Sequence, residues 1–166
     1  MNKFKRLAVA FTGPSNSGKT TLIVELSTLL QKNGYKVAIV KHDPADKGTF
    51  DKEGKDSWKF SQTGANVVVT SPTRTSIFKK ESSSINQIIS ILGDFDYLLV
   101  EGLKTLPLPR ICVCRNNLNS DYFEVSDTLA IDNTINKDDI PNCMSTLDLN
   151  NYEDILVWIE QNSKKV

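Results

Sequence analysis

The sequence predicts an α/β fold: a mainly parallel sheet flanked by helices. Uninterrupted apolar runs alternate with segments whose apolar residues recur at helical spacing, as in buried parallel strands joined by helices. A glycine-rich segment, residues 13–20, connects the first apolar run directly to the first helical pattern. The chain has 166 residues, 39% of them hydrophobic, and this is enough for the core of one domain. We therefore expect a single domain over residues 1–166.

The first strand and helix lie on either side of the glycine-rich segment. Residues 7–11 form the apolar strand, and the helix after the segment has one apolar stripe, which comprises Leu22, Ile23, Leu26, Leu29 and Leu30. Asn33 and Gly34 supply the turn chemistry that ends a helix. Residues 37–40 predict a second buried strand. Residues 42–61 are polar with little periodicity, so we expect a long loop there, functional or mobile.

The second half of the chain continues the alternation. Residues 67–70 and 75–78 predict two strands around a Pro-containing turn, which would pair as an antiparallel hairpin. Ser84 and Gln87 form a capping-box pattern before the helical apolar residues Ile85, Ile88, Ile89 and Leu92. Further strands are predicted at residues 97–100, 111–114 and 128–131, and a closing helix contains Ile155, Leu156 and Ile159. In open parallel sheets ligands bind beyond the carboxyl ends of the strands, where polar residues of this chain gather.

The glycine-rich segment matches the complete phosphate-binding P-loop pattern G-x-x-x-x-G-K-[ST]. Its residues are Gly13, Pro14, Ser15, Asn16, Ser17, Gly18, Lys19 and Thr20, and Thr21 follows. In such a loop backbone N–H groups and the start of the helix surround a phosphate. Lys19 would stabilise charge on the β- and γ-phosphates, which is its predicted catalytic role, and the Thr20 hydroxyl would ligate Mg²⁺. The plain alternative is a Gly-Ser turn with an exposed lysine. The motif predicts the P-loop NTPase fold but no particular reaction.

Two carboxylates after strands are candidates for the metal and for catalysis. Glu101 ends the strand at residues 97–100 and fits the Walker B role of holding Mg²⁺ or its water, although acidic residues often end strands in α/β proteins. Asp43 could orient a water toward the γ-phosphate, or it could simply start a turn before Pro44. His42 is the only histidine, and one histidine makes no metal site.

Composition excludes several classes of partner. Twenty basic and twenty acidic residues leave no net charge, so neither nucleic acid nor an acidic membrane is an expected partner. The basic N-terminal residues lead into the first strand, which argues against a signal peptide, and no apolar run is long enough to span a bilayer. With Cys143 the chain has an odd number of cysteines. Cys112 and Cys114 lie on one face of a strand and predict buried packing in a reducing cytoplasm, with a metal site as the alternative.

Base selection has two candidates. The run from Asn136 to Asp139 fits the N-K-x-D type of guanine recognition, in which an aspartate accepts from the ring N1–H and the exocyclic amine. Asp132, at the end of the strand at residues 128–131, is the competing candidate. Both follow a strand, as a base-reading residue should.

Several motifs together resemble the MobB family, which acts in molybdopterin guanine dinucleotide biosynthesis. They are the P-loop, Lys41-His42, Gly54-Lys55-Asp56-Ser57, Gly64-Ala65 and Val100-Glu101-Gly102-Leu103-Lys104. The resemblance implies a homodimeric GTP-binding protein with weak GTPase activity, which assists a MobA-type nucleotidyltransferase in attaching GMP to molybdopterin. It also places Asp56 near the nucleotide or metal, although Asp56 could instead cap a helix through Trp58 and Phe60. The further histidines that often follow Lys-His in this family are missing here, so a histidine-dependent metal or anion role is not expected.

Two other function classes share the phosphate cradle. A small-molecule kinase would need an acceptor site and usually an arginine-bearing lid. Arg74, Arg110 and Arg115 are available, but none lies in an obvious lid segment. A binding switch without productive hydrolysis would use the nucleotide only to order the long loop. For a partner surface, Lys104, Arg110 and the loop from Lys47 to Lys59 offer positive charge to an anionic pterin or an acidic face.

Overall fold

The computed structural model describes residues 4–166, which divide into two compact units. One contains the residues up to His42 together with those from Asp94 to Val166, and the other contains residues 43–93. The P-loop and the strands around it belong to the first unit.

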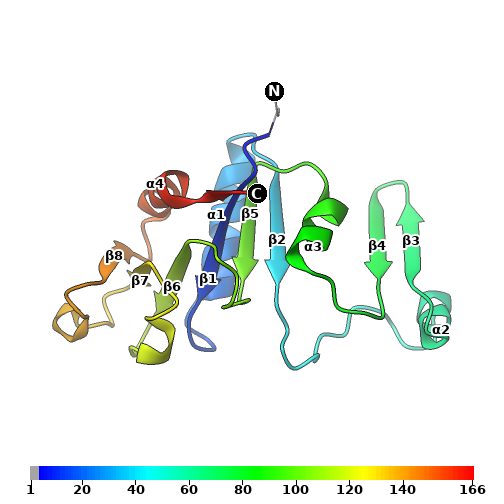
Figure 1. Cartoon of the computed structure of the whole chain (residues 1–166), viewed down its shortest axis with the longest axis horizontal. Coiled ribbons are helices and arrows are strands. Elements are labelled where there is room, and N and C mark those ends of the chain that lie inside the picture. The colour runs from blue at the N-terminus through cyan, green and yellow to red at the C-terminus, as the bar shows by residue number, and fades with distance from the viewer. Residues whose placement is uncertain (1–3) are drawn as a thin grey trace. The chain divides into compact units, whose positions relative to one another are not determined.

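The first unit is built on a mainly parallel sheet with the strand order β2-β5-β1-β6-β7-β8. These strands are β1 (Leu7–Thr12), β2 (Val37–Lys41), β5 (Tyr97–Glu101), β6 (Arg110–Cys114), β7 (Thr128–Ile131) and β8 (Ser145–Asp148). A two-residue strand, β9 (Lys164–Lys165), pairs antiparallel with β1. Because β1, β2 and β5 are parallel, their carboxyl ends point to the same edge of the sheet (Figure 1). The predicted α/β class with a mainly parallel sheet is confirmed.

Helices α1 (Lys19–Lys32) and α4 (Tyr152–Asn162) bury their apolar faces against one side of this sheet. Leu22, Leu26 and Ile155 are almost fully buried there, against strand residues such as Phe11 and Ile111. A second cluster on β6 and β7 contains Cys112, Cys114 and Leu129. The two thiols are buried with their sulfurs 3.5 Å apart, so the prediction that they pack inside the protein is confirmed.

The second unit contains two helices and an antiparallel hairpin. Its elements are α2 (Asp56–Gln62), β3 (Val67–Ser71), β4 (Arg74–Phe78) and α3 (Ile85–Leu92). The hairpin register pairs Val67 with Phe78 and Ser71 with Arg74, which confirms the predicted hairpin. The capping box is also present, since Ser84 accepts from the Gln87 backbone N–H and the Gln87 side chain accepts from Ser84.

Three features differ from the sequence predictions. The expected loop over residues 42–61 is wrong in its last part, because α2 begins at Asp56 and buries Ser61. Asp56 is not the helix cap: Lys55 holds that position, and Asp56 lies in the first turn, 3.7 Å from the Lys59 ammonium. The strands β8 and β9 were not predicted, because their short sequences lack an apolar run and their side chains are mostly exposed.

Two short 3₁₀ turns lie between strands of the sheet, at Ser120–Tyr122 and Lys137–Asp139. Across the described residues, none of the helices is both long enough and apolar enough to cross a membrane.

Candidate functional site

The P-loop connects β1 to α1 at the carboxyl edge of the sheet and is pressed against β6. Gly13 has φ +134°, and a Cβ added there would lie 2.4 Å from the carbonyl oxygen of Val113. Gly18, with φ +96°, precedes the first helical residue, Lys19. These conformations and this close approach explain the two fixed glycines of the motif, because only glycine adopts them without strain. The loop has the shape that the sequence motif predicts.

The Lys19 side chain folds into its own loop. Its Nζ donates to the carbonyl oxygens of Gly13 and Pro14, at 3.0 and 2.6 Å. Burial lowers the pKa of the Lys19 ammonium, an effect that the nearby Glu101 partly opposes. The Ser17 hydroxyl is buried in the same loop and has no hydrogen-bond partner among the described residues. The loop therefore holds a cation and a polar group that an anion would satisfy.

A cavity of about 310 Å³ opens on the outer side of the loop. It is lined by Asn16, Gly18, Lys19, Thr20, Thr21 and Arg115. Thr20 and Thr21 are exposed in the first turn of α1, and Ser15 is exposed at the tip of the loop. The predicted phosphate-binding residues are thus either in this cavity or in the backbone that shapes it.

Glu101 lies next to the P-loop strand, as the Walker B interpretation requires. It is the register partner of Phe11 on β1, and the backbone N–H of Gly102 donates to the Phe11 carbonyl. The Lys41 ammonium, at the end of β2, donates to both Glu101 oxygens at 3.1 Å. His42 packs against Gly102, where an added Cβ would lie 3.1 Å from the His42 Cβ.

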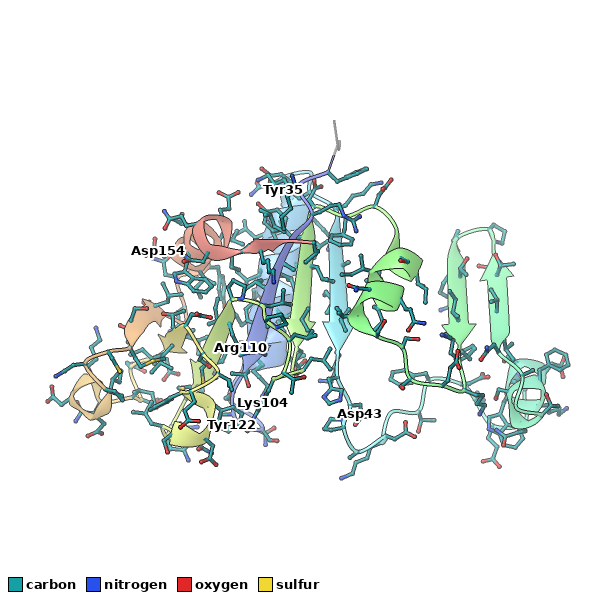
Figure 2. All side chains as sticks on the ribbon, viewed as in Figure 1. Tyr35, Asp43, Lys104, Arg110, Tyr122 and Asp154 are labelled. Atoms are coloured by element: carbon teal, nitrogen blue, oxygen red, sulfur yellow. The ribbon has the colours of Figure 1, made fainter. Side chains whose placement is uncertain are left out.

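A buried arginine braces the segment after Glu101. The Arg110 guanidinium is 1% exposed and donates to the carbonyl oxygens of Gly102, Leu103 and Leu106 at 2.8–3.2 Å. Burial lowers the pKa of this guanidinium. The expectation that Arg110 offers charge to a partner is therefore wrong, because the sheet and the 102–106 segment enclose it. Lys104 is exposed instead, with its ammonium 3.8 Å from the centre of the Tyr122 ring (Figure 2).

Asp132, at the end of β7, is paired with Arg115, which follows the last residue of β6. The Arg115 Nε lies 2.8 Å from Asp132 Oδ2. Asp132 Oδ1 accepts from the backbone N–H and the hydroxyl of Thr134. These hydrogen bonds and the arginine hold the pKa of Asp132 below its usual value, against the opposing effect of burial. The sequence did not indicate that Arg115 lies beside the P-loop, where it lines the cavity.

A second cavity, of about 320 Å³, lies at the carboxyl ends of β7 and β8. Its lining is Ile131, Asp132, Asn133, Ile135, Lys137, Thr146, Leu147 and Asp148. Asp139 belongs to the same 3₁₀ turn as Lys137, and Asn136 caps that turn through its side chain. The Asp139 side chain is exposed. Asp148 was not singled out from the sequence, because its strand was not predicted.

The other two predicted residues lie in the second unit. Asp43 accepts from three backbone N–H groups of its own loop, those of Ala45, Lys47 and Gly48, and these bonds lower its pKa. Its carboxylate thus has the turn-forming role that the sequence left open. Asp56 is exposed at the start of α2. The catalytic role of Asp43 and the ligand role of Asp56 stay predictions.

Known proteins are similar to this chain in sequence and in fold. The family model described as MobB, molybdopterin guanine dinucleotide synthesis protein B, matches residues 8–134. A Methanocaldococcus jannaschii relative is 31% identical over 139 residues, which are 80% of this chain and 58% of that protein. A Haemophilus influenzae molybdopterin-guanine dinucleotide biosynthesis adapter protein is 30% identical over 124 residues, covering 72% of this chain and 69% of the relative.

A crystal structure of molybdopterin-guanine biosynthesis protein B superimposes with a TM-score of 0.70 and 25% identity, and the match covers 93% of this chain and 99% of that one. The likeness extends over both units of the chain. The matched strands include those that carry the P-loop, Glu101 and Arg115. The P-loop fold, the family match and the identity with curated relatives agree, and the chain belongs to the MobB family.

Proposed function

We propose that this protein is an adapter in molybdopterin guanine dinucleotide biosynthesis that binds GTP at the P-loop and hydrolyses it slowly. The observation that carries the proposal is the loop itself: a phosphate cradle that holds the Lys19 ammonium and a buried Ser17 hydroxyl without a hydrogen-bond partner among the described residues. Family membership supplies the pathway. The three free thiols and the absence of an expected membrane partner support a cytoplasmic setting.

Mg²⁺ is the metal that suits the residues at the site. Residues 4–166 contain no group of three or more His, Cys, Asp or Glu side chains that could hold a metal ion by themselves. Mg²⁺ needs no such cage, because it is usually bound by one or two protein oxygens together with phosphate oxygens and water. The Thr20 hydroxyl and the Glu101 carboxylate would hold it, and it would neutralise charge on the β- and γ-phosphates. Lys41, which now contacts Glu101, would be free to contact phosphate.

For guanine selection we propose Asp139 rather than Asp132. A guanine reader must accept two N–H groups. Asp132 lines the cavity beyond β7, but both of its carboxylate oxygens already accept hydrogen bonds. One oxygen accepts two from Thr134, and the other accepts one from Arg115. The Asp139 carboxylate has no hydrogen bond or ion pair within the described part of the chain, and it lies in the turn whose Lys137 lines that cavity. The base would therefore lie over β7 and β8.

Slow hydrolysis fits the distribution of acidic residues. Asp43 is a poor proton acceptor, because three backbone N–H groups stabilise its charged form. An adapter that retains GTP would present a stable surface to the MobA-type nucleotidyltransferase that we propose as its partner. The β3–β4 hairpin supports the proposed homodimer, since Val68, Val69 and Ile77 are 61%, 42% and 46% exposed.

Nucleotide titration of the purified protein tests this function. Lys19→Ala should weaken GTP binding by about ten- to hundredfold, which corresponds to the roughly 1.5–3 kcal/mol of one charge-assisted contact. Lys32→Ala removes an exposed lysine from the last turn of the same helix and serves as the matched control. Unchanged affinity in Lys19→Ala would exclude the P-loop as the binding site.

Further measurements on the purified protein test the base preference and the type of reaction. GTP should compete more strongly than ATP, and Asp139→Asn should shift the preference toward xanthosine triphosphate. Slow release of free phosphate from GTP is expected. In a separate pull-down from cell extract, the immobilised protein should retain a nucleotidyltransferase. Transfer of phosphate to a small acceptor, together with a preference for ATP, would identify a kinase instead.

A further inference from the structure

Arg115 lies on the opposite side of the P-loop from the proposed metal site. It directly follows β6, whereas Glu101 ends β5, and β1 runs between these two strands. Its guanidinium lies flat against Gly18: a Cβ added to Gly18 would be 3.7 Å from Cζ and 3.8 and 3.9 Å from the two Nη atoms. Arg115 is therefore held at the start of α1, where the helix N-terminus attracts anions.

Asp132 fixes the direction of this arginine. Its side chain is 9% exposed, and its second oxygen is tied to Thr134, so the carboxylate cannot turn freely. It uses only the Nε of Arg115. Neither Nη atom has a hydrogen-bond partner anywhere in residues 4–166, and the arginine side chain is 38% exposed. The forked end of the guanidinium, which suits phosphate oxygens, is left available.

Two cavities near Arg115 indicate which phosphate it would meet. Arg115 lines the P-loop cavity with Lys19 and Thr20. Its partner Asp132 lines the cavity of about 320 Å³ at the carboxyl ends of β7 and β8. A nucleotide with its terminal phosphates at Lys19 and its base over β7 and β8 must pass its α-phosphate between these regions.

We propose that Arg115 binds the α-phosphate through its Nη atoms while Asp132 retains Nε, so that Asp132 acts as a positioning residue. This inference rests on the proposed nucleotide-binding function. It gives Asp132 a role other than reading the base. Because nucleoside di- and triphosphates both have an α-phosphate, Arg115 would make the same contact with each. It also explains how a second positive side chain is accommodated beside Lys19, since Asp132 balances its charge.

Calorimetric titration of the full chain with GDP and with GTP, each with MgCl₂, tests the inference. Arg115→Ala should weaken both nucleotides by the same factor, about ten- to hundredfold. Arg115→Lys should recover only part of this loss, because one ammonium cannot serve Asp132 and a phosphate with the geometry of the fork. Arg74→Ala, in the exposed β4 strand of the other unit, is the matched control and should bind as the unmodified protein does.

The role of Asp132 is tested with a double-mutant cycle. Asp132→Ala should weaken binding less than Arg115→Ala, and it should add nothing in the double variant, because it acts only through the arginine. Should Asp132→Ala fail to fold, Asp132→Asn, which keeps an acceptor for Nε, should bind nearly as well as the unmodified protein.

Each outcome has a distinct meaning. If the unmodified protein binds neither nucleotide, the proposed function fails and the inference fails with it. If it binds both and Arg115→Ala binds them equally well, the inference alone is wrong. A loss confined to GTP would overturn the assignment to the α-phosphate, and losses that multiply in the double variant would overturn the positioning role of Asp132.

Discussion

Gly13→Ala is the substitution that most directly tests the packing of the P-loop against the sheet. A Cβ at this position would lie 2.4 Å from the Val113 carbonyl oxygen, and real Cβ atoms essentially never approach closer than 3.0 Å. The obstructing atom belongs to the backbone of a buried central strand, which no side-chain rotation can move away. Either β6 or the loop must shift, and β6 is held by its pairing with both β1 and β7.

The expected loss of stability has two parts. The positive φ of Gly13 disfavours alanine by about 1–2 kcal/mol, and overpacking against β6 adds about 1–3 kcal/mol. Gly34→Ala is the matched control, because Gly34 also has a positive φ, +82°, but an added Cβ would meet nothing within 4 Å. Only the first part applies to the control. The two variants should therefore differ by about 1–3 kcal/mol in the free energy of unfolding.

Urea unfolding followed by circular dichroism measures this difference. With a urea dependence of about 1–3 kcal/mol/M, the midpoint for Gly13→Ala should lie roughly 1 M below that for Gly34→Ala. GTP binding should be lost in Gly13→Ala at urea concentrations where the protein is still folded, because the displaced loop no longer surrounds the phosphate. Equal midpoints for the two variants would refute the proposed contact with β6.

Two further predictions concern other parts of the first unit. Arg110→Met should lower the free energy of unfolding by about 3–5 kcal/mol, because it leaves three carbonyl oxygens without their donor. Lys104→Met removes an exposed side chain and should change the free energy of unfolding little. Similar urea midpoints for the two variants would count against the bracing role of Arg110. Hydrogen bonds from Lys5 and Tyr97 lower the pKa of Glu160 in the folded protein below its ordinary value of 4.5. The ionised carboxylate therefore stabilises the fold at pH values above 4.5, and this stabilisation is lost as the pH falls through the lower pKa of the folded state. The difference in thermal unfolding temperature between the unmodified protein and Glu160→Gln should therefore shrink between pH 6 and pH 2.5, and a difference that does not depend on pH would exclude this linkage.

The parts of the fold that could be predicted are those encoded by neighbouring residues. The P-loop, the capping box at Ser84 and the apolar strands each depend on a short segment, and each lies where the sequence predicts it. β9 could not be predicted in this way: Lys164 and Lys165 form a strand only because they pair with Leu7 and Ala8 at the start of β1, ahead of the β1–β6 pairing, which begins at Ala10. The helix α2 was predicted only as an alternative to the loop, because a seven-residue helix has too little periodicity to separate it from a polar loop.

The candidate site was predicted as a set of separate residues, but its pairs were not. Lys41 and Glu101 are 60 residues apart, and Arg115 and Asp132 are 17 apart. Each residue follows a strand, so the sequence places all four at one edge of the sheet. Which of them meet depends on the strand order β2-β5-β1-β6-β7, in which β2 neighbours β5 and β6 neighbours β7. Strand order is a property of the folded chain, and no local pattern reveals it.

The pairing of Lys41 with Glu101 leads to a last prediction, on the order of partners at the site. Mg²⁺ alone would have to displace the Lys41 ammonium from Glu101, and phosphate alone would bring further negative charge toward that carboxylate. When the metal and the nucleotide bind together, the Lys41–Glu101 contact would be replaced by two others. Glu101 would contact Mg²⁺, and Lys41 would contact phosphate. Because each ligand relieves the cost of binding the other, Mg²⁺ and GTP should bind with positive coupling, of the roughly 1–3 kcal/mol typical of such linkage.

Titrations of GTP with MgCl₂ and with EDTA measure this coupling. The unmodified protein should lose about 5- to 150-fold in GTP affinity without the metal. In Glu101→Gln the carboxylate charge is gone, so the loss should be smaller, and the metal-free affinity should rise because Lys41 is free to contact phosphate. Lys32→Gln, which alters an exposed lysine in the last turn of α1, should behave as the unmodified protein does. The same dependence on Mg²⁺ in Glu101→Gln and in the unmodified protein would show that the metal is held without this carboxylate.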